Sequence, residues 1–147
     1  CEAAAKTNIS SLVDCNADRF LAPENMTKEV QAACRESGQK VPEGIAEAAS
    51  VIYRSLAKCY ADTIAEIEQM SGITYDSIHI VGGGANAAYL NELTAKATGK
   101  TVYAGPTEAT AIGNLTAQMI AEGELADLQE ARKYIFESFE IRKFVDK

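Results

Sequence analysis

The residues best suited to hold a ligand are three consecutive glycines in the stretch "IHIVGGGANAAYL", residues 78–90. Gly82, Gly83 and Gly84 follow an apolar run and precede a helical pattern. Because glycine has no Cβ and tolerates positive φ, a ligand can lie directly against such a backbone. The first N–H groups of a helix have no intrahelical partner and can face that ligand. A strand, a glycine turn and a helix start therefore indicate a nucleotide site, whereas a tight packing turn would need only one glycine.

A dinucleotide site is one alternative, because Gly82, Gly84 and Ala87 match the G-x-G-x-x-A fingerprint. That fingerprint normally has an acidic partner at the end of the next strand, about 20 residues on, which holds the ribose. Here the next predicted strand ends in Ala-Gly-Pro at 104–106. No Lys-Ser or Lys-Thr pair comes directly after the three glycines, so they do not form a phosphate-binding Walker A loop. The acidic residue that a dinucleotide site needs for the ribose is therefore missing from its expected position.

The elements around the glycines predict a parallel strand pair. Residues 77–81 form a short, nearly continuous apolar run, which is typical of a strand buried on both faces, and His79 within it is expected to be a core histidine. A helix ending near Gly99 and a second strand at 100–105 complete a right-handed βαβ unit. Two strands alone do not make a stable sheet. Further strands are therefore expected either from residues 1–26 or from outside this chain.

The rest of the chain is predicted to be mostly helical. Residues 1–26 are irregular, 27–72 hold a short helix and a long one, 77–138 form a βαβα core, and 139–147 are a tail, all within a single α/β, helix-rich domain. The long helix is predicted to pack on an apolar stripe at steps of three and four: Ile45, Ala49, Ile52, Leu56, Tyr60, Thr63, Ile67 and Met70.

Three smaller features concern the later helices. Thr107 is the predicted N-cap of one helix, and Gly113 within that helix is expected to allow close packing on the sheet or the glycine turn. Asp127 and Glu130 resemble a capping box and predict the start of a last helix.

The composition excludes several classes of protein. The 147 residues are 47% hydrophobic with a net charge of −7 and scattered basic residues, which disfavours a nucleic-acid surface. No apolar run approaches the ~20 residues that span a bilayer. Four cysteines without a CxxC pair and one histidine support no metal site and indicate reduced thiols in a cytoplasmic protein. The first residue is Cys1, not Met, so the chain is expected to be a piece of a longer protein.

Longer motifs carry a resemblance to a known family. "IHIVGGG", followed by "LNELTAKATGKTVYAGPTEATAIGNL", is similar to the C-terminal part of the FGGY carbohydrate kinases. The upstream motifs "DCNADRFLAPENM", "QAACRESGQKVPE" and "YRSLAKCYADTIAEIEQM" resemble the same family in the same order. The similarity runs from about Ile9 to Phe139, and the spacing between the glycines and "AGPTEATAIGN" is its most specific feature.

The resemblance implies a two-lobed sugar kinase of the actin/hexokinase-like ATPase fold, with RNase H-like cores and ATP with Mg²⁺ in the cleft between the lobes. This chain would be a fragment of the C-terminal, nucleotide-side lobe, with a small parallel sheet flanked by helices. The implied sugar is L-rhamnulose, with fuculose and xylulose as alternatives. No catalytic or metal residue is assigned here, because the resemblance implies that these lie in the missing N-terminal lobe. The fragment alone is expected to be inactive.

The same resemblance assigns Gly82, Gly83 and Gly84 to the adenine or ribose of ATP, not to its phosphates. Family members commonly carry an Asn three residues after the third glycine. Here that position is Ala87, and Asn86 lies one residue earlier. Asn86 is therefore the candidate for this contact, provided that it sits in an irregular first turn and not in the helix. A helical interaction module without a ligand is the remaining alternative.

Overall fold

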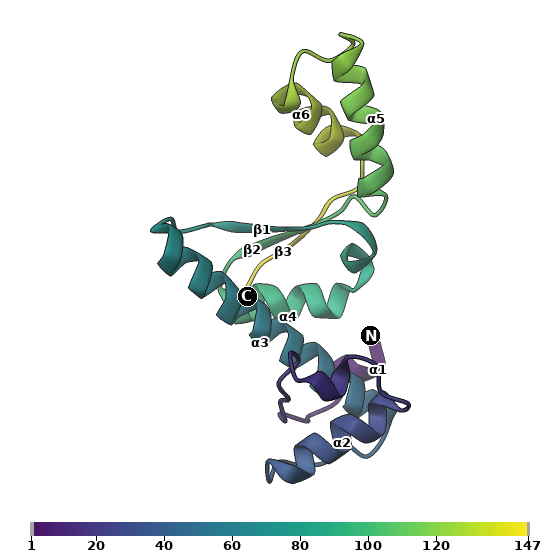
Figure 1. The fold of residues 1–147 in the computed structure, drawn as a ribbon, viewed down its shortest axis with the longest axis vertical. Coiled ribbons are helices and arrows are strands. Elements are labelled where there is room, and N and C mark those ends of the chain that lie inside the picture. The colour runs from purple at the N-terminus through teal and green to yellow at the C-terminus, as the bar shows by residue number, and fades with distance from the viewer. Residues whose placement is uncertain (1, 147) are drawn as a thin grey trace.

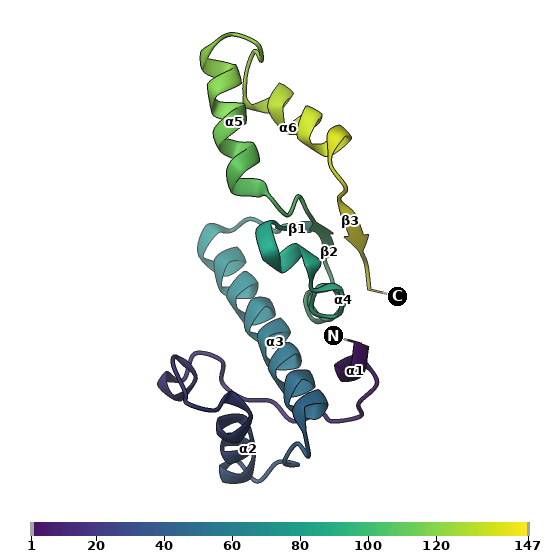
Figure 2. The ribbon, with the colours of Figure 1, turned by 90° about the vertical axis from the view of Figure 1, so that its right-hand side faces the viewer.

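The computed structural model describes residues 2–146. Its longest element is the helix α3 (Ile45–Ser71). Figure 2 shows α3 extending from α2 (Met26–Glu36) to the neighbourhood of strand β1 (Ser77–Ile80). The predicted long helix is confirmed, including its end at Gly72, which has a left-handed φ of 69°.

The predicted packing face of α3 is wrong in detail. The residues that α3 buries are centred on Ala48, Val51 and Ser55, whereas Ile45 and Met70 at the ends of the predicted stripe are 81% and 88% exposed. Ile45 and Met70 lie on sides of the helix that no other described residue covers. Periodicity identified the helix, but its neighbours determined which side is buried.

One end of the molecule holds a small core between the N-terminal segment, α2 and α3. This core consists of Ile9, Val30, Cys34 and Val51. Residues 2–25, before α2, contain two short helical turns, α1 (Glu2–Ala5) and η1 (Asp18–Phe20), and are otherwise irregular. Side chains replace the missing backbone ladder: the Gln39 amide both accepts from the Leu12 N–H at 2.9 Å and donates to the Leu12 carbonyl at 2.7 Å.

The middle of the molecule holds a three-stranded sheet in the order β1-β2-β3 (Figure 1). Strand β2 (Thr101–Ala104) pairs in parallel with β1, and helix α4 (Ala88–Thr98) makes the connection, so the predicted βαβ unit is confirmed. Strand β3 (Arg142–Phe144) pairs with β2 antiparallel, which makes the sheet mixed and not purely parallel. The third strand therefore comes from the predicted tail, not from either source that we expected.

The two faces of the sheet differ. Helix α4 covers one face and contacts β2; Ala95 of α4 and Val102 and Ala104 of β2 are buried. On the other face His79 is exposed and stacks on Tyr103, with ring centroids 5.1 Å apart and planes at 22°. The predictions of a core histidine and of burial on both faces are thus wrong for this chain.

The reason is the course of the last two helices, α5 (Ala109–Ala121) and α6 (Leu128–Ser138). Figures 1 and 2 show that they form a hairpin that extends away from the sheet and leaves most of its outer face uncovered. Of these two helices, α6 approaches that face, where Arg132, Ile135 and Phe136 line a hollow with His79. The ring centroids of Phe136 and Tyr103 lie 6.2 Å apart in an edge-on arrangement.

The starts of the last two helices follow different rules. The predicted Asp127 cap is confirmed, because its carboxylate accepts from the N–H groups of Gln129 and Glu130. Thr107 is not the cap of α5, since that position is Glu108. Gly113 is exposed, and a Cβ built on it meets no atom within 4 Å, so the close packing expected there is not present within the described chain.

None of the helices described is both long and apolar enough to cross a membrane. Cys15, Cys34 and Cys59 carry free thiols, and Cys1 lies outside the described residues.

Candidate nucleotide site

Two loops lie side by side at one edge of the sheet. The glycine loop (Gly82–Asn86) forms a 3₁₀ turn after β1, and a second loop, residues 105–108, follows β2. Since parallel strands end at the same edge, both loops emerge there, which is where open α/β sheets bind ligands. The Gly82 N–H donates to the Pro106 carbonyl at 3.0 Å, and the Gly105 N–H donates to the Ile80 carbonyl at 2.9 Å. These two hydrogen bonds fix the loops to each other.

The three glycines differ in what requires them. Gly82 has a φ of 72°, a left-handed conformation that a side chain strains. Gly84 would place a Cβ 3.5 Å from the Ile80 side chain, an ordinary contact. Gly83 would place a Cβ in open space, and both Gly83 and Gly84 are exposed. The loop geometry therefore requires only Gly82, and the other two glycines leave bare main chain facing solvent.

Asn86 lies in the 3₁₀ turn itself, because α4 begins two residues later at Ala88. Its side chain is exposed, and the Thr107 hydroxyl donates to its Oδ1 over 3.4 Å. Asn86 is thus part of the irregular first turn, which is the arrangement that its predicted role needs. Thr107, interpreted from the sequence as a helix cap, is instead its neighbour in the second loop. The contact between Asn86 and a nucleotide stays a prediction.

Behind the exposed surface, Ala85 anchors the glycine loop. Ala85 is 1% exposed, and its carbonyl accepts from the Asn91 Nδ2 group at 3.0 Å and from the Arg142 Nη2 group. Sequence analysis missed both donors. Arg142 lies 57 residues from Ala85 in a stretch without any recognisable pattern, so no local signal could have identified it.

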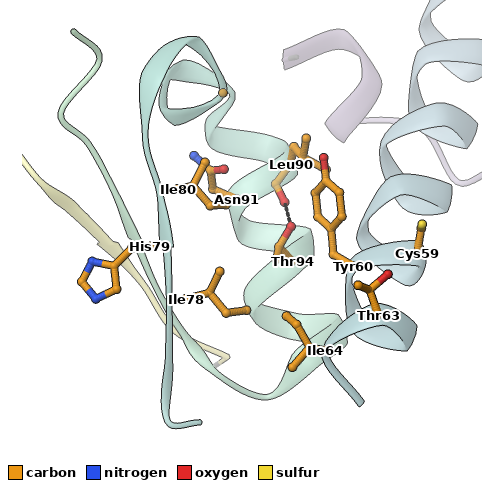
Figure 3. A pocket seen from close by; sticks show the side chains of 11 residues that line it. Cys59, Tyr60, Thr63, Ile64, Ile78, His79, Ile80, Leu90, Asn91 and Thr94 are labelled. Atoms are coloured by element: carbon orange, nitrogen blue, oxygen red, sulfur yellow. Dashed lines mark hydrogen bonds between the residues drawn. The ribbon is translucent and has the colours of Figure 1, made fainter. Parts of the chain in front are cut away.

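An apolar groove of about 520 Å³ lies between α3, β1 and α4, next to the loop. Figure 3 shows Ile78 pointing into this apolar groove, whereas His79 points to the opposite side of the strand. Tyr60, Ile64 and Leu90 line it together with Gly84 and the fully buried Asn91. The Asn91 Oδ1 atom is buried and has no hydrogen-bond partner among the described residues.

A second hollow, of about 540 Å³, lies on the outer face of the sheet. Val81 and Gly105 line it at the base of the two loops, and Ile135 and Phe136 line it from α6. Strand β1 therefore separates two largely apolar hollows, and the glycine loop follows it at their shared edge. Within residues 2–146, no three His, Cys, Asp or Glu side chains are grouped so as to hold a metal ion. The arrangement presents exposed main chain and one amide side chain, which suit a flat, uncharged group.

Comparison with known proteins gives a consistent result. Residues 1–122 match the model of the FGGY family of carbohydrate kinases, C-terminal domain. The chain is 47% identical to a rhamnulokinase of Halalkalibacterium halodurans over 94% of its own length, and 48% identical to a rhamnulokinase of Bacillus subtilis over 99%. A rhamnulokinase of Enterococcus faecalis is 50% identical over 86% of the chain.

The chain spans only 30% of the length of the first two relatives and 26% of the third. The strand, glycine turn and second loop lie within the part that the family model matches, and β3 lies beyond it. The chain therefore belongs to the FGGY family of carbohydrate kinases, with a helix-rich form of the actin/hexokinase-like ATPase fold in its C-terminal domain.

Proposed function

We propose that this chain is the nucleotide-side part of an ATP-dependent sugar kinase, and that its glycine loop contacts the adenine or ribose of ATP. The observation that carries the proposal is the pairing of the glycine loop with the second loop at the carboxyl edge of two parallel strands. Exposed main chain at Gly83 and Gly84 leaves room for a flat base, and Asn86 offers it a donor and an acceptor.

The proposed reaction of the whole protein transfers the γ-phosphoryl group of ATP to a sugar hydroxyl and releases ADP and a proton. Positioning and charge neutralisation dominate such transfers, and Mg²⁺ supplies much of that neutralisation when it is bound. We propose that the rest of the polypeptide supplies the metal ligands and the base, and that this chain binds and orients the adenosine end. L-rhamnulose is the proposed acceptor, because the relatives named above are rhamnulokinases. We place the activity in the cytoplasm, where ATP is available and the free thiols stay reduced.

We also propose that the rest of the same polypeptide covers the apolar groove and adds a strand to the free edge of β1. The chain spans about 30% of its relatives, so most of the parent protein lies outside it. Strand β1 pairs only with β2 among the described residues, and a sheet of three short strands gains stability from further strands. The buried Asn91 Oδ1 atom is an acceptor that an incoming N–H group would satisfy.

This covering can be tested in the full-length protein with Ile64→Arg, which places a charge in the apolar groove. The control is Glu66→Arg on the exposed side of the same helix. We expect Ile64→Arg to lower the melting temperature strongly and Glu66→Arg to leave it within about 2 °C, because exposed substitutions rarely change stability much. Equal melting temperatures for both variants would show that the groove stays open to solvent.

The nucleotide contact can be tested with Gly83→Val in the same full-length protein. Gly83 has space for a side chain, so the variant should fold normally while its isopropyl group blocks the proposed base position. We expect the KM for ATP to rise at least about tenfold, which corresponds to about 1.4 kcal/mol. The control is Gly44→Val at the N-cap of α3, which is distant in sequence from the glycine loop. It shows how much a glycine-to-valine change outside the proposed site affects stability and the KM for ATP. An unchanged KM for ATP in Gly83→Val, or tighter binding of NAD than of ATP to the parent, would contradict the proposal.

A further inference from the structure

The C-terminal strand β3 contacts both loops of the proposed nucleotide site. Arg142 stands opposite Ala104 at the end of β2, next to the second loop. Just before β3, the Glu140 carbonyl lies 2.5 Å from the point where a Cβ on Gly105 would be. The segment that leads into β3 is therefore packed directly against the backbone of the second loop.

The side chain of Arg142 reaches the glycine loop. Its Nη2 group donates to the Ala85 carbonyl, and the Asn91 Nδ2 group donates to the same oxygen. A carbonyl oxygen has two lone pairs, so these donors use its full capacity. A hydrogen bond from a guanidinium is roughly twice as strong as one between neutral groups. The centre of the glycine loop is thus held from α4 by a neutral donor and from β3 by a charged one.

Such an anchor matters because of the composition of the loop. Three successive glycines have more conformational freedom than any other tripeptide, and a ligand that binds them must order them. Conformational freedom that the loop loses on binding weakens affinity, whereas a loop already held in the bound shape avoids that cost. The buried Ala85 carbonyl is the point at which this restraint acts, directly between the exposed Gly84 and the exposed Asn86.

We propose that Arg142 is a positioning residue for nucleotide binding: it clamps the Ala85 carbonyl and holds the glycine loop in its ATP-binding shape. The inference rests on the function proposed above. Residue 142 lies beyond residues 1–122, which match the family model. The match with the Bacillus subtilis rhamnulokinase covers 99% of this chain and therefore includes the segment that forms β3.

The test compares Arg142→Gln, Arg142→Lys and Lys143→Gln in the full-length kinase. Lys143 is the matched control, because it is the next residue of β3 but its Nζ atom lies 5.8 Å from the Tyr103 ring centroid, on the outer face of the sheet. We expect Arg142→Gln to raise the KM for ATP about five- to thirtyfold, the range given by one or two kcal/mol. The KM for the sugar and kcat should stay within about twofold. Arg142→Lys keeps the charge and should restore part of the affinity.

Hydrogen exchange supplies a second measurement that does not depend on activity. The amides of residues 83–87 should exchange faster in Arg142→Gln than in the parent or in Lys143→Gln. A lower melting temperature with an unchanged KM for ATP would overturn the proposal, as would an equal rise in KM for Lys143→Gln. If Arg142→Gln does not fold, Arg142→Lys decides, because wild-type exchange and KM in that variant would show that the specific guanidinium contact is not needed.

Gly83→Val, measured in the same assay, separates this inference from the proposed function. If Gly83→Val leaves the KM for ATP unchanged, the loop does not contact the nucleotide and both proposals fail. If Gly83→Val raises it and Arg142→Gln does not, the loop binds the nucleotide and only the clamp is wrong.

Discussion

The Glu140 carbonyl oxygen lies 2.5 Å from the position that a Cβ on Gly105 would occupy, so these two residues fix the distance between the second loop and the C-terminal segment. Gly105 also has a φ of 134°, a conformation that side chains rarely adopt. Because Glu140 belongs to the segment that leads into β3, a side chain at position 105 would push against the chain just before the strand that pairs with β2. The close approach therefore links a glycine of the proposed site to the one strand that sequence patterns did not predict.

Gly105→Ala should destabilise the protein by about 2–5 kcal/mol, from backbone strain and overpacking together. The methyl group meets backbone atoms on the other side, which cannot move aside as a flexible side chain can. Chemical denaturation measures the loss. Hydrogen exchange should show it concentrated in β3, and a variant with normal exchange in residues 142–144 would contradict this account.

Gly113→Ala should have the opposite effect in the 147-residue chain. Gly113 lies inside α5, where a Cβ meets no atom within 4 Å, and alanine is favoured over glycine in a helix by up to about 1 kcal/mol. The free energy of unfolding should therefore rise. The same substitution in the full-length protein tests whether another segment packs on this face of α5, since it would then be neutral or destabilising.

Asn86→Ala should raise the KM for ATP about three- to tenfold and reduce the preference for ATP over GTP. An amide that hydrogen-bonds the base discriminates between bases, because the wrong base leaves polar groups without partners. Thr107→Val is the control, since it removes only the hydroxyl that lies 3.4 Å from the Asn86 side chain. If the two variants change the nucleotide preference equally, Asn86 acts by joining the loops and not by contacting the base.

Acid should weaken the junction between α3 and the sheet through Glu68. The Lys100 ammonium, 2.6 Å away, and the Tyr75 N–H hold the pKa of the Glu68 carboxyl below its usual value of 4.5. A carboxyl with a lowered folded-state pKa contributes stability above its unfolded pKa and loses it as pH falls through the folded one. Stability attributable to Glu68 should therefore be present at neutral pH and decline below about pH 4.5.

Glu68→Gln tests this dependence because it keeps an oxygen that accepts from Tyr75 but removes the charge that pairs with Lys100. We expect the variant to be less stable than the parent at pH 7 and to lose less stability on acidification. Glu66→Gln, an exposed carboxylate on the same helix, should follow the parent curve. Parallel curves for Glu68→Gln and the parent would show that the ion pair contributes nothing.

The sequence by itself determined the local elements and the centre of the proposed site. Three glycines after an apolar run identified the turn between β1 and α4, and periodicity with a terminal glycine identified α3. The Asp127 cap identified the start of α6. These signals are local, because turn residues, caps and helical spacing act over a few residues along the chain.

Only the tertiary structure decided what these elements pack against. A three-residue strand such as β3 is too short to show a pattern, and its place beside β2 follows from the return of the chain after α6. The exposure of His79 depends on helices that extend away from the sheet, and the bond from Arg142 to Ala85 joins residues 57 positions apart. The burial of a side chain and the pairing of a strand depend on contacts between segments that are distant in the sequence. The residue types within one segment do not specify those contacts.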